Sequence, residues 1–150
     1  MGMKILVACE ESQAVTIELR KLGHEAYSCD ILEQSGGHPE WHIKGDAVVT
    51  AYDRKCKWDM MIAHPPCTLL SNAGARWLYP KGELNKDRYK KGLNAKDFFM
   101  QLINAPIDKI AVENPTPSSI FGLPKHTQEI QPYQFGDEIQ KRTLLWLKNI

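Results

Sequence analysis

The sequence lacks the features that mark several classes of protein. It has no apolar run of about 18 residues that could cross a membrane, and no segment resembles a secretory signal peptide. Neither sign of charge dominates, since 19 Lys and Arg against 18 Asp and Glu give a formal net charge of +1. Any attraction to nucleic acid must therefore come from a local basic patch.

The four cysteines, at positions 9, 29, 56 and 67, lack Cys-x-x-Cys spacing. Together with the missing signal peptide, this indicates a reduced, cytoplasmic setting without a membrane partner. At 150 residues, 43% of them hydrophobic, the chain can bury one ordinary core but not two. We expect a single domain over residues 1–150. Because residues 144–150 have the pattern of a strand, we expect this domain to continue past its last residue.

Short apolar runs alternate with segments of helical spacing along the chain. Residues 3–9 and 25–30 indicate strands, and residues 12–22 between them indicate a helix that Gly23 ends. Further expected elements are a loop over 31–45, a brief strand or turn over 46–50, a strand from Trp58, a basic loop over 72–94, a helix over 95–103, a strand over 109–112, a Pro-rich connection to Pro124, the segment 131–135 and a strand over 143–147. This alternation predicts an α/β, Rossmann-like fold, with a mostly parallel sheet and helices on both faces.

The apolar run that ends at His64 is followed by Pro65 and Pro66, which deliver a single thiol, Cys67. Both prolines fix their φ angles and lack an N–H group, so the chain leaves strand geometry there and holds Cys67 in a stiff loop. An accessible thiolate is a strong nucleophile. We expect Cys67 to be that nucleophile and the thiols at 9, 29 and 56 to be non-catalytic, whereas a buried small hydrophobe is the alternative role for any cysteine.

A second strand end, Val112-Glu-Asn-Pro115, carries an acid and an amide. An apolar wall around Glu113 would favour the protonated carboxyl, which can donate to a ring nitrogen. The alternative is an acid that caps a helix or pairs with a cation. Asp30, Cys67 and Glu113 all follow predicted strands, and in a parallel sheet such positions lie at one edge, where ligands bind. A thiol and a carboxylic acid there suit addition of sulfur to an electron-poor pyrimidine ring.

The order of these motifs resembles that of the DNA cytosine-5 methyltransferase family. The Pro-Pro-Cys loop and the Glu-Asn strand end of that family are similar to His64-Pro-Pro-Cys67 and Val112-Glu-Asn-Pro115, and its Gln-x-Arg segment is similar to Gln140-Lys-Arg142. The resemblance runs from about Lys4 to the end of the chain. The small size suggests a minimal, phage-encoded member.

The resemblance implies a role for each catalytic candidate. Cys67 would attack C6 of cytosine, Glu113 would contact N3, Asn114 would support the loop, and Arg142 would contact the flipped base or its backbone. The methyl donor would be S-adenosylmethionine. The implied cofactor-binding residues are Cys9, Glu10, Asp30 at the ribose hydroxyls, Ile31, Asp46 near the adenine, and Pro65. The implied substrate is DNA, with single-stranded DNA included.

Two alternatives remain open. The first loop, from Cys9 to Gln13, has no glycine where the family has a glycine-rich turn, Leu144 stands where a second arginine is expected, and the chain shows no target-recognition domain. These departures favour an enzyme that modifies a pyrimidine nucleotide, or one that uses another one-carbon donor. A catalytically degenerate domain that binds nucleic acid or protein is the other alternative.

Two further patterns have competing explanations. Residues 81–91 are rich in lysine and carry Tyr89, with Tyr79 just before them, so this loop could contact phosphates and stack on a base or could simply be solvated. His38, His42 and Cys56 are chemically suited to zinc, with Cys29 as a weak fourth ligand. Because Pro39 disrupts a helical pairing of the two histidines, we expect no metal site.

Overall fold

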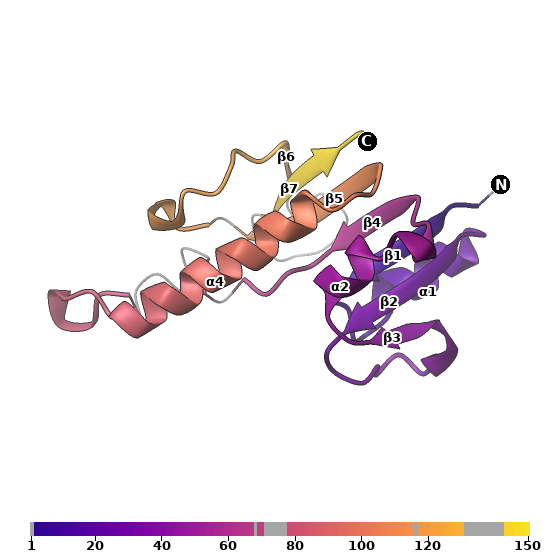
Figure 1. The fold of residues 1–150 in the computed structure, drawn as a ribbon, viewed down its shortest axis with the longest axis horizontal. Coiled ribbons are helices and arrows are strands. Elements are labelled where there is room, and N and C mark those ends of the chain that lie inside the picture. The colour runs from indigo at the N-terminus through magenta and orange to yellow at the C-terminus, as the bar shows by residue number, and fades with distance from the viewer. Residues whose placement is uncertain (1, 68, 71–77, 116, 131–142) are drawn as a thin grey trace.

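The computed structural model describes residues 2–67, 69–70, 78–115, 117–130 and 143–150. Within these residues, seven strands form one sheet in the order β3-β2-β1-β4-β5-β7-β6 (Figure 1). Their bounds are β1 Lys4–Ala8, β2 Glu25–Asp30, β3 His42–Lys44, β4 Met60–Ala63, β5 Lys109–Pro115, β6 Gln128–Ile130 and β7 Thr143–Lys148. The neighbouring pairs among β1 to β5 are parallel, whereas β7 is antiparallel to both β5 and β6. The prediction of a mostly parallel sheet is confirmed.

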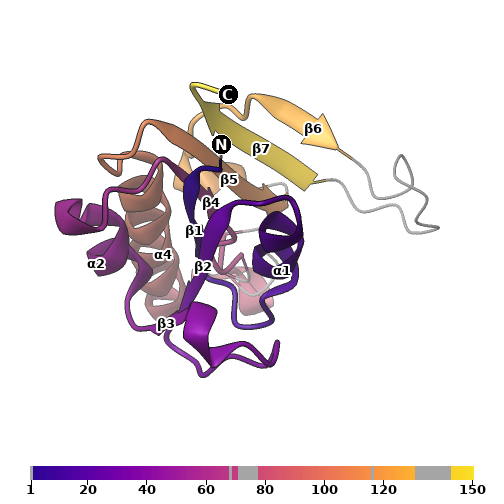
Figure 2. The ribbon, with the colours of Figure 1, turned by 90° about the vertical axis from the view of Figure 1, so that its right-hand side faces the viewer.

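Helices cover both faces of this sheet. Figure 2 shows α1 (Ala14–Lys21) on one face, and α2 (Ala47–Tyr52) and α4 (Lys86–Ile103) on the other. Successive residues of a strand point to opposite faces, so Ile5 and Val7 of β1 pack toward α1, while Leu6 and Ala8 join the larger core. The remaining short turns are 3-10 helices at η1 Pro39–Trp41, η2 Arg54–Cys56, η3 Pro80–Gly82 and η4 Ser119–Phe121. The prediction of helices on both faces is also confirmed.

The opening β1-α1-β2 unit follows the sequence prediction closely. Helix α1 ends at Lys21, and Gly23, just beyond its C-cap residue Leu22, has a φ of 92° in the left-handed region that favours glycine. The Gly23 amide donates to the Arg20 carbonyl at 3.0 Å, and the His24 amide donates to the Leu19 carbonyl at 3.1 Å. This pair of hydrogen bonds is a Schellman motif, which satisfies the last carbonyls of the helix and turns the chain into β2.

The region from 31 to 52 corrects two predictions. Residues 46–50 are not a strand, because Asp46 accepts a 2.8 Å hydrogen bond from the Val48 amide and thereby caps α2. Their β-branched residues favour a strand, but Ala47 and Ala51 bury one face of a helix in the core. The predicted loop over 31–45 contains β3, an edge strand whose three residues are too few to show a period of two.

Helix α4 begins at Lys86, nine residues earlier than the predicted helix at 95, so the predicted basic loop is partly helical. The Asn85 side chain caps it by accepting a hydrogen bond from the Arg88 amide at 3.2 Å. The first half of α4 extends beyond the sheet (Figure 1), which explains why its exposed residues lack an apolar period. There it packs against η4, where the rings of Tyr89 and Phe121 stack with centroids 5.8 Å apart.

Two of the later strands were predicted and are longer than expected, whereas the edge strand β6, Gln128–Ile130, was not predicted. The strand predicted over 109–112 extends to Pro115, and the strand predicted over 143–147 extends to Lys148. The segment 131–135 lies outside the described residues. No helix in the described ranges is both long enough and apolar enough to cross a membrane.

Candidate active site at the carboxyl edge of the sheet

The sheet order reverses direction between β1 and β4. From β1 the chain moves outward through β2 and β3, and then returns to β4 on the other side of β1. Ligands of open α/β sheets bind in the crevice beyond the carboxyl ends of the strands at such a reversal. The loop after β1 begins at Cys9, and the loop after β4 begins at His64. Both loops therefore lie where the fold favours a site.

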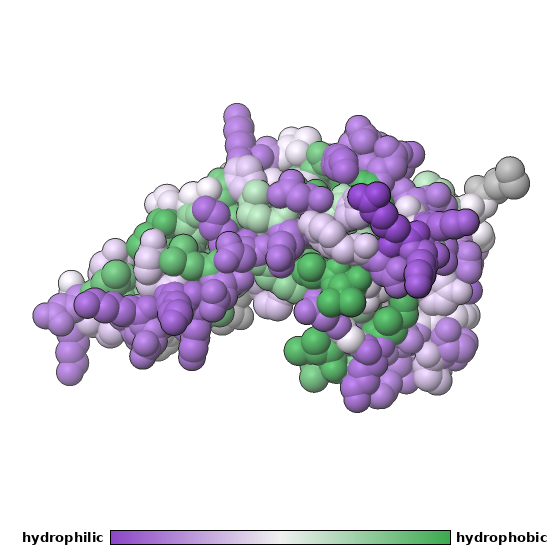
Figure 3. Space-filling view, in the orientation of Figure 1, coloured by the Kyte–Doolittle hydropathy of each residue, from purple (hydrophilic) through white to green (hydrophobic). Residues whose placement is uncertain are grey.

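A cavity of about 660 Å³ opens at this edge of the sheet. Four of the six predicted cofactor-binding residues line it, namely Cys9, Asp30, Ile31 and Asp46. Pro66 of the Pro-Pro loop and Phe98 of α4 also line it. Hydrophobic side chains gather around the hollow beneath α4 in Figure 3. The volume suits a small-molecule ligand, and the combination of apolar walls with two carboxylates suits one with a flat ring and hydroxyl groups.

The two carboxylates are held by the local backbone. Asp30 ends β2, and its Oδ1 accepts a hydrogen bond from the Leu32 amide at 2.9 Å. Asp46 caps α2 through its Oδ1. Among the hydrogen bonds between described residues, neither aspartate uses Oδ2, so each can offer an oxygen to a ligand.

In the first loop, residues other than glycine adopt the left-handed backbone conformation. Cys9 and Gln13 adopt φ angles of 62° and 61°, in the left-handed region that glycine usually occupies. The fully buried Gln13 side chain donates to Ser28 Oγ at 3.1 Å and to the His38 carbonyl at 2.8 Å, and accepts from the His38 amide at 3.1 Å. These three hydrogen bonds hold Gln13 in its strained backbone conformation. Sequence reasoning missed Gln13. The available signal was Gly36, where a Cβ would lie 2.6 Å from that of Gln13.

Two predicted cofactor-binding residues do not line the cavity. Glu10 is buried, and its carboxylate accepts hydrogen bonds from the amides of Val15 and Thr16, both at 3.0 Å, and from Thr16 Oγ1 at 2.9 Å. It therefore holds the amino end of α1, where negative charge is favourable. Pro65 is also buried, and the neighbouring Pro66 reaches the cavity in its place.

The end of β5 contacts the Pro-Pro loop through two side chains. Asn114 is 1% exposed and donates from Nδ2 to the Pro65 carbonyl at 3.1 Å. Glu113 places Oε2 at 2.9 Å from Nδ1 of His64. The expected apolar wall around Glu113 is absent, because its carboxyl faces this imidazole ring and is 33% exposed. The structure thus joins Glu113 and Asn114 to the loop that carries Cys67.

Cys67 is half-buried two residues beyond Pro65, and its carbonyl accepts a hydrogen bond from the Leu70 amide at 3.1 Å. The other thiols are poor nucleophiles. Burial raises the pKa of Cys9 to about 12, with the charges of Asp30 and then Cys29 and Asp46 adding to the effect. Burial is also the main cause that raises the pKa of Cys29 and of Cys56. Arg142, the remaining catalytic candidate, lies outside the described residues.

The histidines considered as metal ligands have other partners. His38 stacks on Trp41 with ring centroids 4.0 Å apart, and His42 hydrogen-bonds through Nδ1 to Ser28 at 2.8 Å. In the part of the chain that the structure describes, no cluster of three or more His, Cys, Asp or Glu residues could hold a metal ion.

Comparison with known proteins yields a likeness in fold. No family model matches the chain, and a search of curated proteins finds no match. Three solved structures cover nearly all of it. PH0851 matches with a TM-score of 0.60 and 10% identity, over 97% of this chain and 42% of that one. A protein assigned as a DNA modification methyltransferase encoded within a prophage of E. coli matches with a TM-score of 0.55 and 9% identity, over 97% of this chain and 46% of that one. The Dnmt2 methyltransferase of S. pombe matches with a TM-score of 0.56 and 13% identity, over 99% of this chain and 50% of that one.

The chain spans half or less of the length of each of these proteins. At identities of 9–13%, the likeness defines the class of fold. The protein is a Rossmann-like α/β protein with its candidate site at the β1–β4 reversal.

Proposed function

We propose that the protein transfers a methyl group from S-adenosylmethionine to C5 of cytosine in DNA. The observation that carries this proposal is the position of Pro66, which lines the cavity and directly precedes Cys67. A methyl donor bound in the cavity would therefore lie beside the loop that carries the nucleophile. Two of the proteins with a similar structure are described as methyltransferases, one of them for DNA modification, which supports this choice of reaction.

The cavity fits the proposed cofactor. The carboxylates of Asp30 and Asp46 would accept hydrogen bonds from ribose hydroxyls and from the adenine amino group, and Ile31 and Phe98 provide apolar surface for the adenine ring. The bound cofactor supplies an electrophilic methyl group on a positively charged sulfur. The cavity lining carries two carboxylates against one lysine, Lys91, so a cation of this kind is compatible with it.

The protein's own residues would prepare the pyrimidine ring. The Cys67 thiolate forms an Sγ–C6 bond as the C5–C6 double bond breaks, while Glu113 transfers a proton to N3. The electron pair freed by this addition makes C5 nucleophilic. After methylation, loss of the C5 proton to a base and cleavage of the Sγ–C6 bond restore the ring and the thiolate, and N3 returns its proton to Glu113.

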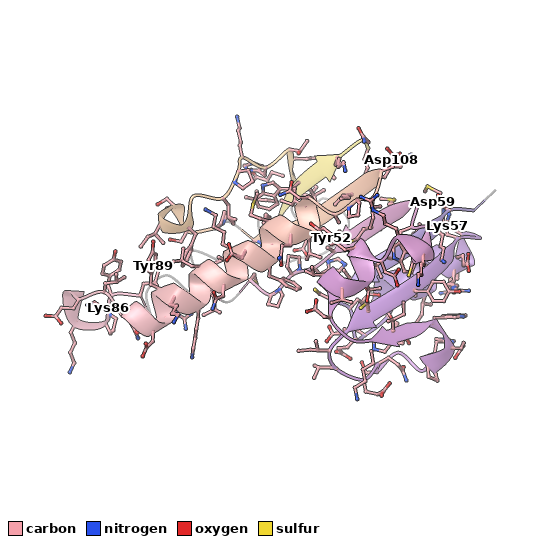
Figure 4. The ribbon with its side chains drawn as sticks, viewed as in Figure 1. Tyr52, Lys57, Asp59, Lys86, Tyr89 and Asp108 are labelled. Carbon is pink, nitrogen blue, oxygen red and sulfur yellow. The ribbon has the colours of Figure 1, made fainter. Side chains whose placement is uncertain are left out.

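The first half of α4 supports DNA as the substrate. Its basic residues stand on an arm that extends away from the sheet, where Figure 4 labels Lys86 and Tyr89. Between described residues, the lysines at 81, 86, 90, 91 and 96 form no ion pair within 4.0 Å. Phosphates could therefore reach them. Tyr89 is engaged with Phe121, so Tyr79, which is 51% exposed, is the better candidate to stack on a base.

Methyl transfer can be tested with cofactor that carries a labelled methyl group. We expect label on single- or double-stranded DNA, none on free deoxycytidine monophosphate, and loss of labelling in Cys67→Ala. Cys56→Ala is the matched control, because this thiol precedes β4, at the opposite end of the strand from the Pro-Pro loop, and does not line the cavity. Labelling of the nucleotide alone would favour the nucleotide-modifying alternative. Absence of both labelling and cofactor binding would favour a non-catalytic domain.

A further inference from the structure

His64 directly follows β4, at the β1–β4 reversal, and lies between carboxylates from two other elements. Its Nδ1 is 2.9 Å from Oε2 of Glu113 on β5, and its Nε2 is 3.9 Å from Oε2 of Glu10 in the loop after β1. The backbone amide of His64 donates to the Ala8 carbonyl at 3.0 Å. The ring is therefore anchored across the β1–β4 reversal, at the end of the strand that leads to Cys67.

The two ring nitrogens have different partners. When the proton of the Glu113 carboxyl is on Oε1, or is absent, Oε2 accepts a hydrogen bond, and the proton of this contact is then on Nδ1. Nε2 is buried, and among the described residues it has no hydrogen-bond partner. Glu10 faces it but is too distant for a hydrogen bond and is already bound to Val15 and Thr16. The one strong bond of the ring is thus the bond to Glu113.

We propose that His64 is the positioning residue for Glu113. By holding Oε2 through Nδ1–H, the ring directs Oε1 toward the pyrimidine and leaves it to carry the proton destined for N3. The same hydrogen bond stabilises the carboxylate left after that transfer. This inference rests on the proposed function, because it assigns a task to Glu113 in the reaction.

The test compares three substitutions in the whole 150-residue chain. His64→Asn keeps an N–H donor near the place of Nδ1, His64→Gln places its donor nearer Nε2, and His64→Ala has none. We expect kcat for methyl transfer to fall about 100-fold in H64A, the usual scale for a misplaced catalytic group. H64N should regain most of this loss, whereas H64Q should not. Binding of S-adenosylmethionine should stay unchanged in all three, because His64 does not line the cavity.

A merely structural role for His64 would lower the melting temperature and kcat together and would not distinguish Asn from Gln. Wild-type kcat in H64A, or equal kcat values in H64N and H64A, would overturn the inference alone. If the unmodified chain transfers no methyl group, the proposed function fails and the inference fails with it. Because the unmodified chain is assayed first, the two failures are distinguishable.

Discussion

The hydrogen bond between Asn114 and the Pro65 carbonyl allows a quantitative prediction. Both residues are buried, so Asn114→Ala leaves the carbonyl without a partner away from water. Such a loss costs about 1–3 kcal/mol of the free energy of unfolding. For a domain of this size, each kcal/mol lowers the melting temperature by about 2–4 °C. We therefore expect a decrease of about 2–12 °C.

Function should also suffer in this variant, because Pro65 fixes the start of the loop that carries Cys67. We expect the rate of covalent capture of a cytosine analogue by Cys67 to fall about 10- to 100-fold. The matched control is Asn104→Ala, which removes an exposed amide at the end of α4 and should change stability by less than about 0.5 kcal/mol.

Thermal denaturation and a trapping time course measure both effects of N114A. The reasoning fails if N114A matches N104A in melting temperature and the unmodified chain in trapping rate. In that case the contact with Pro65 would not hold the loop.

Three further predictions concern other parts of the molecule. Gly92→Ala would bring a Cβ to 2.3 Å from Phe121 Cζ, so we expect denaturant unfolding to show a free energy of unfolding lower by about 1–3 kcal/mol, despite the better helix propensity of alanine. Because the two side chains clash, the double variant with Phe121→Leu should lose less stability than the sum of the two single losses. Additive losses would contradict this. Because burial raises the pKa of Cys9 from 9.0 to about 12, the unfolded chain loses the thiol proton first, and the stability present below pH 9 falls by about 1.4 kcal/mol per pH unit as the pH rises toward 12. Unfolding at pH 8, 10 and 11 should show a shallower fall in Cys9→Ala, and parallel curves would refute the assignment. Asp46→Ser keeps a capping oxygen for the Val48 amide but removes the carboxylate from the cavity, so calorimetry should show cofactor binding weakened about 10-fold or more with little change in stability, whereas Asp46→Ala should lose both; normal binding by the serine variant would remove Asp46 from the site.

Most of the fold could be predicted from the sequence, because its strands are short apolar runs and its first helix has a regular apolar face. The elements that were wrong have physical reasons. Residues 47–52 have the composition of a strand, but they form a helix because Asp46 caps its first turn and because Ala47 and Ala51 are buried in the core. The first half of α4 has no buried stripe along most of its length, since it leaves the sheet, so periodicity could not detect it.

The candidate site was only partly accessible to sequence reasoning. The position of Asp30 at the end of a predicted strand placed it at the edge where the cavity opens, whereas Asp46 was suggested only by the family resemblance. The partnership of His64 with Glu113 could not be predicted, because it depends on the register between β4 and β5, which places these residues side by side beyond Ala63 and Val112. Likewise, the capping role of Glu10 depends on the path of a loop that sequence spacing does not specify.

The most direct test of the account is covalent trapping on DNA that contains 5-fluorocytosine, in the presence of S-adenosylmethionine. Fluorine at C5 cannot leave as a proton does, so an enzyme that adds a thiolate to C6 stays attached to the DNA. The account predicts a denaturation-resistant complex whose DNA-linked peptide contains Cys67, and no complex with Cys67→Ala. A complex linked through Cys9, Cys29 or Cys56, or DNA methylation that persists in Cys67→Ala, would contradict it.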